Sequence, residues 1–241
     1  MFDTLILSAG LGTRLLPLTR STPKPLLHIS ESQTILSRLI SQFSENEGDI
    51  YININHLAQC FLDTSKVGSM NCIRFIYEKE RLGSHNTLKL VSGFSPRSLL
   101  VVHGDLVLSK NEAIKLVHSI HKNPDQSLMV VHERLQSEAR SIVSLDSEGT
   151  IVNFREVEVS SHLSEPCYSN SGIYYFSKTD LESLALEFRR PLGMDLSAYV
   201  IRQLISMRLL RSHSWNADRV SIDSLEALDR ASRMLIDGCF K

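Results

Sequence analysis

Short apolar runs alternate with helical patterns along most of this chain, and this alternation restricts the possible folds more than any other feature. The apolar, β-rich runs lie at 4–9, 50–54, 73–78, 98–105, 127–133 and 172–177. Apolar residues recur every three or four positions, as in a helix, at 34–48, 111–123 and 195–207. Several runs are apolar throughout, as in strands that are covered on both faces. The order predicts an α/β fold with a mostly parallel sheet flanked by helices.

Residues 141–159 break this order, because two short β-rich segments flank the turn sequence DSEG (146–149). Such a pattern is typical of an antiparallel hairpin, so we expect a mixed, mostly parallel central sheet. The chain has 241 residues, of which 42% are hydrophobic, and it contains no Pro/Gly-rich linker. We therefore expect a single domain with one substantial core.

A loop with two glycines and two cations follows the first strand, in the sequence SAGLGTRLLPLTRSTPKPLL (8–27). In an open parallel sheet, ligands bind beyond the carboxyl ends of the strands. Gly10 and Gly12 let the backbone approach a ligand and present its N–H groups to phosphate oxygens. Arg14 and Lys24 add positive charge, and three prolines stiffen the loop. We interpret the loop as a rigid anion-binding site.

Several other functions are excluded by pattern and charge. The P-loop pattern GxxxxGK[ST] and the dinucleotide pattern GxGxxG are both absent from this loop. The formal net charge of −1 gives no general attraction to nucleic acid or to an anionic membrane. No apolar run approaches the roughly 20 residues of a membrane span, and the beginning MFDTLILSAG enters a strand without a basic leader. We therefore expect a cytoplasmic protein. Its four cysteines are expected to be free thiols, because no two of them form a CxxC pair.

Asp105 is the best candidate for a metal ligand. It follows the apolar run SLLVVHG (98–104), so its carboxylate is expected at the edge of the sheet where ligands bind. Mg²⁺ prefers one or two carboxylates together with phosphate oxygens and water. The alternative is that Asp105 only shapes a turn or caps a helix.

The string LSAGLGTRLLPLTRSTPKPLL (7–27) resembles the GxGTR, PLT and PKP signature of the sugar-1-phosphate nucleotidylyltransferases. The resemblance covers almost the whole chain and continues in YEKERLGSHNTL (77–88), VVHGDL (101–106), FREVE (154–158), SNSGIYYF (169–176) and SIDSLEAL (221–228). It implies one Rossmann-like domain over 1–241, with a nucleotide-binding half at about 1–125 and a sugar-phosphate-binding half at about 126–241. The greatest similarity is to mannose- or heptose-phosphate guanylyltransferase-like proteins.

The resemblance implies a Mg²⁺-dependent enzyme of nucleotide-sugar and cell-surface polysaccharide biosynthesis. It would transfer a nucleotidyl group from a nucleoside triphosphate (NTP) to a sugar-1-phosphate and release pyrophosphate. The acceptor phosphate is largely ionised at neutral pH, so the reaction needs positioning and charge neutralisation but no general base. Arg14 and Lys24 would be catalytic, with Arg14 nearer the leaving pyrophosphate and Lys24 nearer the transferred phosphoryl group.

The resemblance also assigns the binding residues. Those implied for the nucleotide are Ser8, Ala9, Gly10, Gly12, Thr13, Gly83, Ser84 and Asn86, and either Ser84 or Asn86 is expected to cap the following helix. Those implied for the acceptor are Gly104, Glu156, Asn170 and Gly172. Asp105 and Asp223 are the metal ligands expected.

Three places depart from the family pattern. His85 and Asn86 stand where small residues are usual, Val157 stands where Lys is common, and Ser221 stands where Asp is common. These departures keep two alternatives open, namely a cytidylyltransferase acting on a non-sugar phosphate such as phosphocholine, and a catalytically idle regulatory homologue. The base, the acceptor and the oligomeric state are left open as well.

Asp223 is expected to replace the missing carboxylate at 221. In an extended stretch residues 221 and 223 point to the same side, so Asp223 can present its charge on the same face. The alternative is that Asp223, or Ser224 beside it, caps a helix over 224–236.

Overall fold

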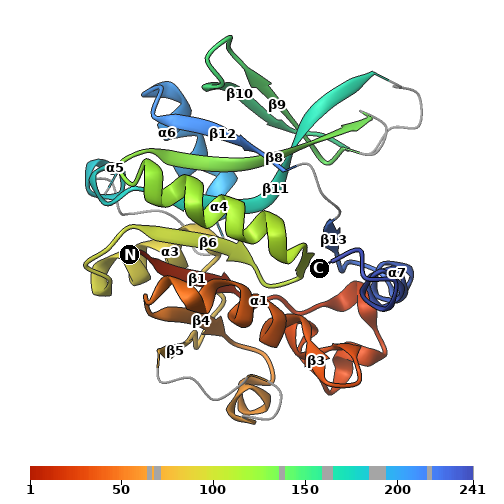
Figure 1. Ribbon diagram of the computed structural model, residues 1–241. Helices are drawn as coiled ribbons and strands as arrows, with labels where there is room; N and C mark the ends of the chain where they lie inside the picture. Colours follow the sequence, from red (N-terminus) through yellow and green to blue (C-terminus); the bar gives the residue numbers. More distant parts are fainter. Residues whose placement is uncertain are drawn as a thin grey trace. The chain divides into compact units, whose positions relative to one another are not determined.

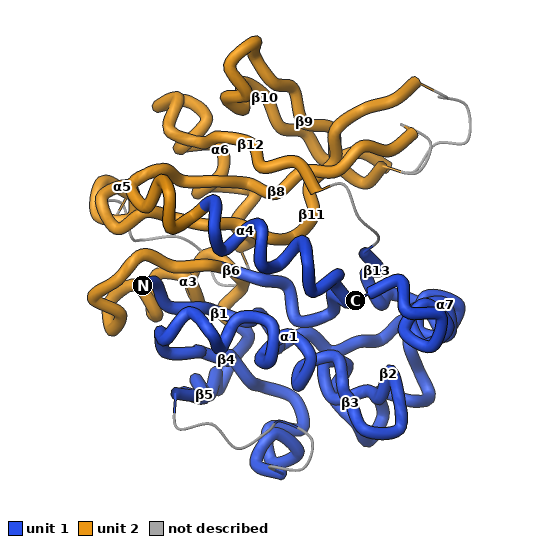
Figure 2. The backbone as a smooth tube through the Cα atoms, viewed as in Figure 1, with its two compact units in different colours: residues 1–81, 101–119, 217–241 blue, residues 82–100, 120–216 orange. Residues whose placement is uncertain are grey.

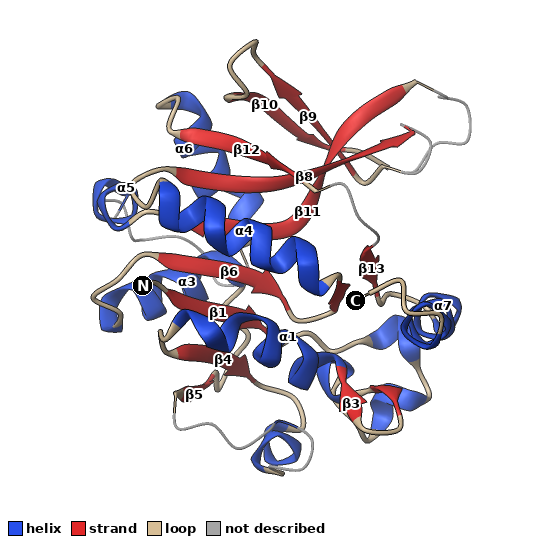
Figure 3. Ribbon diagram, viewed as in Figure 1, coloured by secondary structure: helices blue, strands red, loops and turns tan. Residues whose placement is uncertain are grey.

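The computed structural model describes residues 1–63, 67, 72–135, 139–158, 165–184, 194–215 and 219–240. The chain forms two compact units, which Figure 2 distinguishes by colour: unit 1 comprises 1–81, 101–119 and 217–241, and unit 2 comprises 82–100 and 120–216. Both units combine helices with strands, as Figure 3 shows. The α/β class and the mixed sheet predicted from the sequence are confirmed.

Unit 1 is built around parallel strands (Figure 1). β4 (Ile50–Ile54) pairs with β1 (Asp3–Leu7) on one side and with β5 (Ile73–Tyr77) on the other, both in parallel. β6 (Leu99–His103), of which residues 101–103 belong to unit 1, precedes them in the order β6–β1–β4–β5. β4 is buried along its whole length, which explains why its sequence is an unbroken apolar run apart from Asn53.

The helix predicted at 34–48 is shorter than expected. α1 (Ile35–Phe43) starts with a capping box, in which Thr34 Oγ1 accepts from Ser37 N at 3.0 Å and Ser37 Oγ accepts from Thr34 N at 2.9 Å. A 3-10 turn, η4 (Ser44–Asn46), then ends the helical segment. The helix predicted at 111–123 is α4 (Lys110–Lys122).

Short strands that the sequence did not predict complete unit 1. β2 (His28–Ser30) pairs with β3 (Gln33–Thr34), and β7 (Leu106–Leu108) pairs with β13 (Arg219–Ser221), both antiparallel. α7 (Leu225–Ile236) follows β13.

Unit 2 contains a mixed set of strands. β8 (Ser127–Leu135) pairs antiparallel with β11 (Pro166–Phe176) and parallel with β12 (Leu210–Ser214). The predicted hairpin is present as β9 (Ser141–Leu145) and β10 (Ile151–Glu156), and β9 also pairs with β11. β11 carries a bulge between Asn170 and Tyr174.

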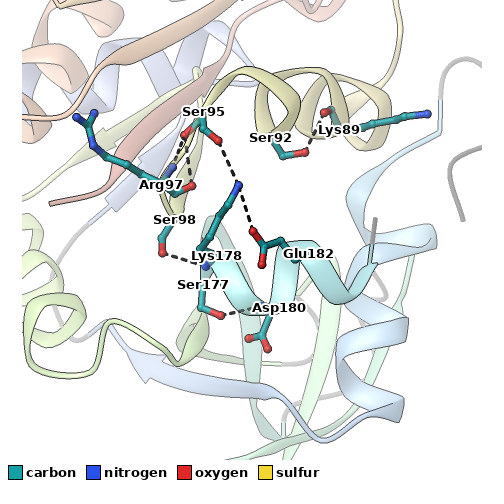
Figure 4. A network of polar contacts seen from close by, with 9 residues as sticks. All are labelled: Lys89, Ser92, Ser95, Arg97, Ser98, Ser177, Lys178, Asp180 and Glu182. Carbon is teal, nitrogen blue, oxygen red and sulfur yellow. Dashed lines mark hydrogen bonds and ion pairs between the residues drawn. The ribbon is translucent and has the colours of Figure 1, made fainter. Parts of the chain in front are cut away.

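Polar contacts join the end of α3 (Ser84–Phe94) to the start of α5 (Lys178–Leu184), as Figure 4 shows. The Lys178 backbone N–H donates to Ser98 Oγ at 3.0 Å, and its Nζ donates to Ser95 O at 3.4 Å. The helix predicted at 195–207 is divided into a 3-10 turn, η7 (Leu196–Ala198), and α6 (Val200–Ser206). Among the helices that the structure describes, each is too short or too polar to cross a membrane.

Candidate active site

The loop after β1 is folded into three 3-10 turns, η1 (Thr13–Leu15), η2 (Leu18–Arg20) and η3 (Lys24–Leu26). Gly12 has a φ of 65°, and a Cβ there would lie 2.9 Å from Thr19 Cγ2 and 3.2 Å from Lys24 Cβ. Thr19 Oγ1 donates to Gly12 O at 2.8 Å, which ties the first turn to the second. Both backbone conformation and space therefore require glycine at position 12.

The two predicted catalytic cations line one cavity of about 230 Å³ in unit 1. Its lining residues are Gly12, Thr13, Arg14, Leu15, Lys24 and Asp223. The loop and residue 223 are about two hundred positions apart in the sequence, yet the fold places them around the same space. A cavity that combines two cations, a carboxylate and loop backbone is suited to a polyanion and a cation bound together.

Lys24 and Asp105 form an ion pair next to this cavity. Lys24 Nζ lies 2.6 Å from Asp105 Oδ2, and the two side chains are 16% and 24% exposed. Ser221 Oγ donates to the same oxygen at 3.3 Å. Burial alone would raise the pKa of Asp105, but the charges of Lys24 and His103 and the two hydrogen bonds hold it below its ordinary value.

The segment before α7 runs beside Asp105. Ile222 N donates to Asp105 O at 2.8 Å, which places the backbone between Ser221 and Asp223 against that residue. Ser224 is the N-cap of α7, since its Oγ accepts from Ala227 N at 3.2 Å. Of the two residues considered for that cap, the structure selects Ser224, and Asp223 lines the cavity instead.

The oxygen donors fit a hard divalent cation. Mg²⁺ needs only one or two protein carboxylates when phosphate oxygens and water complete its coordination. Asp223 lines the cavity and Asp105 pairs with Lys24, which also lines it, whereas no cluster of three or more His, Cys, Asp or Glu suitable for a metal occurs in the described ranges. The donor set therefore matches a metal held jointly by protein and phosphate.

The other residues predicted in unit 1 have well-defined surroundings. Ser8 is buried, and its backbone N–H donates to Asn53 Oδ1 at 2.6 Å. A Cβ at Gly104 would lie 2.6 Å from Leu7 O, so close packing alone explains the glycine there. A Cβ at Gly10 would meet no atom within 4 Å, so packing does not explain that glycine.

The predicted cap of α3 is wrong. Gly83, with a φ of 81°, is the N-cap, and Ser84 is already the first residue of the helix. Ser84 Oγ accepts from Leu196 N at 2.9 Å, and Asn86 Nδ2 donates back to Leu82 O at 3.0 Å. The glycine adopts a conformation that Ser and Asn reach only at a cost, so it takes the position before the helix.

His85 is a core residue of unit 2. It is 2% exposed and packs edge-to-face against Tyr199, with the ring centroids 5.2 Å apart. This contact gives a structural reason for a large side chain at a position where the family pattern has a small one.

Three of the four predicted acceptor residues, Glu156, Asn170 and Gly172, lie on strands of unit 2 that pair with β9, whereas Gly104 belongs to unit 1. Glu156 is exposed, is paired with Ser141 in the β10–β9 register, and accepts from Ser197 Oγ at 2.6 Å. Asn170 N donates to Ser141 Oγ at 3.0 Å. Glu156 and Asn170 therefore flank the same residue of β9.

The Asn170 side chain also holds the bulge of β11 together. Its Nδ2 donates to Tyr174 Oη at 2.5 Å, and its Oδ1 accepts from Gly172 N at 2.9 Å. Gly172 has a φ of 75°, which the bulge requires. Sequence reasoning missed this role, and the only available signal was the adjacent pair of polar residues before a glycine.

Comparison with known proteins identifies several similar chains. The family model described as nucleotidyl transferase matches residues 3–213. Mannose-1-phosphate guanylyltransferase catalytic subunit beta from Drosophila pseudoobscura pseudoobscura is 28% identical over 193 residues, which are 76% of this chain and 50% of that protein. The UTP–glucose-1-phosphate uridylyltransferase of Synechocystis is 28% identical over 214 residues, which are 80% of this chain and 53% of that protein. The chain thus spans about half the length of these curated relatives.

Solved structures share the fold. HddC from Yersinia pseudotuberculosis complexed with GMP-PN superposes with a TM-score of 0.76 at 20% identity, covering 98% of this chain and 100% of that one. At this identity the likeness concerns the fold only.

Proposed function

The chain is a member of the nucleotidyl transferase family, and we propose that it transfers a nucleotidyl group from an NTP to a sugar-1-phosphate. The observation that carries this proposal is the cavity of unit 1, which Arg14, Lys24 and Asp223 line together and beside which Lys24 contacts Asp105. The names of the two curated relatives, a guanylyltransferase and a uridylyltransferase of sugar-1-phosphates, support the same substrate class.

In this reaction an acceptor phosphate oxygen forms a bond to the α-phosphorus, and the bond from the α-phosphorus to the bridging oxygen of the β-phosphate breaks. The electron pair leaves with pyrophosphate. The acceptor is already ionised near neutral pH, because the second pKa of a phosphate monoester is about 6. The protein therefore needs to hold two anions together and to neutralise charge, which is the task that Arg14 and Lys24 would perform.

We propose Mg²⁺ as the metal, with Asp105 and Asp223 as its protein ligands. When bound, the ion would supply charge neutralisation at the phosphates. Lys24 already contacts Asp105, so the lysine and the metal would act at the same carboxylate. The loop backbone at Ala9, Gly10, Gly12 and Thr13 would provide N–H donors for the nucleotide, and Ser8, whose own N–H donates to Asn53 Oδ1, would position the start of that loop.

In unit 2 we propose that Gly83, Ser84 and Asn86 contribute to nucleotide binding. Glu156 would accept hydrogen bonds from acceptor hydroxyls, since its carboxylate is exposed on β10. Asn170 and Gly172 would contribute through the bulge of β11, and Gly104, which belongs to unit 1, through its backbone. Apart from Gly104, these assignments follow the nucleotide-binding and sugar-phosphate-binding halves expected at about 1–125 and 126–241.

The proposal is tested by a coupled pyrophosphate-release assay with Mg²⁺ and each of ATP, GTP, CTP, UTP and dTTP. Each nucleotide is combined with glucose-, mannose- and heptose-1-phosphates and with phosphocholine. We expect release only when an NTP and a sugar-1-phosphate are both present. Pyrophosphate release only with phosphocholine would show that the acceptor is phosphocholine and not a sugar-1-phosphate. No release with any pair would indicate a catalytically idle homologue.

A further inference from the structure

We propose that Asn53 is a positioning residue for the phosphate-binding loop, acting through the backbone N–H of Ser8 and itself oriented by Glu78. The proposal rests on the proposed function, because the loop that it positions carries Arg14 and Lys24. All of these residues belong to unit 1.

The three residues meet at the carboxyl ends of three adjacent parallel strands. Asn53 lies in β4, where it is paired with Leu7 of β1 and with Ile76 of β5. Ser8 directly follows β1, and Glu78 directly follows β5. Ser8, Asn53 and Glu78 are only 4%, 4% and 2% exposed, so solvent cannot replace their hydrogen bonds.

One amide side chain connects all three strand ends. Asn53 Oδ1 accepts from Ser8 N at 2.6 Å, and Asn53 Nδ2 donates to Glu78 Oε1 at 2.8 Å. Glu78 is held by its own backbone as well, because its N–H donates to Ile54 O at 2.9 Å and its carbonyl accepts from Asn55 Nδ2 at 2.7 Å.

The bond to Ser8 determines where the loop leaves the sheet. A buried backbone N–H needs an acceptor, and β1 has already ended at Leu7. Asn53 supplies that acceptor from its side chain, so residue 8 stays attached to β4 while the chain beyond it is free to turn away. Gly10 and Gly12 follow within four residues, so the course of the loop through them depends on the position of Ser8.

Glu78 determines which end of the Asn53 amide faces Ser8. A carboxylate only accepts hydrogen bonds, so it must face the NH₂ end, and the carbonyl end is left for the Ser8 N–H. Reversing the amide would place two acceptors together at Glu78 and two donors together at Ser8. The Glu78 carboxylate thus influences the loop indirectly, by orienting the side-chain amide of Asn53.

The inference can be tested by exchanging the amide and the carboxylate between positions 53 and 78. Asn53→Asp keeps an acceptor for Ser8 but places a second carboxylate against Glu78, which repels it. Glu78→Gln keeps an acceptor for Asn53 Nδ2. The double variant N53D/E78Q restores one acceptor toward Ser8 and one amide donor between the two side chains, with donor and acceptor exchanged.

Turnover is measured with each of the five NTPs and the sugar-1-phosphates of the pyrophosphate-release assay. We expect N53D to lower kcat on the order of 10²-fold, since a loop displaced by about 1 Å misplaces Arg14 and Lys24. E78Q, whose amide can donate as well as accept and so no longer fixes the Asn53 orientation, should lower kcat less than N53D does. N53D/E78Q should return to within about threefold of the parent, because both hydrogen bonds are restored. Thr34→Ala, which removes the cap of α1, is the matched control: it should lower Tm and leave kcat unchanged.

The proposal is overturned if N53D lowers Tm as Thr34→Ala does but keeps the parental kcat, or if the double variant regains Tm and not kcat. If the parent chain turns over no substrate pair, the proposed function fails while the inference is still testable by amide hydrogen exchange. The Ser8 N–H should then exchange slowly in the parent and in N53D/E78Q and faster in N53D. Equal Ser8 exchange in the parent and N53D would contradict the inference.

Discussion

At the scale of single residues, the proposed chemistry depends most on the contact between Lys24 and Asp105. They lie 81 positions apart in the sequence, and their charged atoms are 2.6 Å apart in the fold. Sequence patterns predicted both residues for the site, because one belongs to a basic loop and the other follows an apolar strand. Their direct pairing was not predictable, since no local pattern encodes the distance between two loops.

Replacing either cation of the cavity should remove activity without unfolding the protein. Arg14→Ala and Lys24→Ala are each expected to lower kcat on the order of 10²-fold or more, because both cations face accumulating negative charge. Lys115→Ala is the control, since Lys115 also pairs with a carboxylate, that of Glu112, but is 67% exposed on α4. Steady-state pyrophosphate release measures the effect, and parental rates in both cavity variants would refute the assignment.

The depressed pKa of Asp105 makes a definite prediction about stability in acid. Its pKa in the folded state lies below the ordinary value of 3.8, so its contribution is fully present above that value and is lost as the pH falls through the folded value. The difference in free energy of unfolding between the parent and Asp105→Asn should therefore be constant above about pH 5 and shrink in more acidic solution. Urea unfolding at a series of pH values measures it.

The exposed Asp229 provides the comparison for that experiment. It pairs with Arg233 on the surface of α7, and its side chain is 58% exposed. Asp229→Asn should change the free energy of unfolding much less than Asp105→Asn near neutral pH, because exposed pairs contribute little. An equal change in the two variants would show that the Lys24–Asp105 pair has no special role in stability.

Substitutions at Asp223 and Ser224 should distinguish metal binding from helix capping. Ser224→Ala is expected to cost about 1 kcal/mol of stability through the lost cap of α7, with an unchanged Mg²⁺ requirement. Asp223→Asn should instead raise the Mg²⁺ concentration needed for half-maximal rate, with little change in Tm. Titration of activity with Mg²⁺ together with thermal unfolding distinguishes them, and an unmoved Mg²⁺ requirement in Asp223→Asn would end its assignment as a ligand.

At the scale of elements, the long apolar strands and the helices were predictable because their patterns are local. The strands of two or three residues were not, because β2, β3, β7 and β13 exist only through their partners. β11 starts at Pro166, six residues before the predicted strand, because its first half is polar and carries the bulge. The cap of α3 was misplaced because Ser and Asn are good caps in general, while the positive φ at Gly83 is a property of the folded turn.

Gly104 tests how tightly β1 packs beside the Asp105 turn. A Cβ at 104 would lie 2.6 Å from Leu7 O and 2.7 Å from Ser8 Oγ, so the backbone around the loop must shift. We expect Gly104→Ala to cost about 1–3 kcal/mol, in the range of overpacked cores. Gly93→Ala is the control, and it should increase the stability. A Cβ at this position in α3 meets nothing within 4 Å, and alanine favours a helix over glycine by up to about 1 kcal/mol. Chemical denaturation compares the two, and a Gly104→Ala variant as stable as the parent would disprove the tight contact.

At the scale of the whole molecule, membership of the nucleotidyl transferase family rests on residues 3–213, which include the loop, Asp105, Glu156 and the bulge of β11. The residues that depart from the family pattern have structural explanations in two places. His85 packs against Tyr199, and Ser221 donates a hydrogen bond to Asp105 that a carboxylate at position 221 could not donate. Nothing in the structure explains valine at position 157, where the family pattern has lysine.

In the proposed reaction, the cavity around Arg14 and Lys24 directs attack at the α-phosphorus of an NTP. The most direct measurement is a single turnover with NTP labelled with ³²P at either the α or the γ position, in the presence of Mg²⁺ and sugar-1-phosphate. We expect the α label to appear in a nucleotide-sugar and the γ label in pyrophosphate, and we expect Lys24→Ala to slow both on the order of 10²-fold or more. Transfer of the γ label to the acceptor, or its release as inorganic phosphate, would contradict attack at the α-phosphorus.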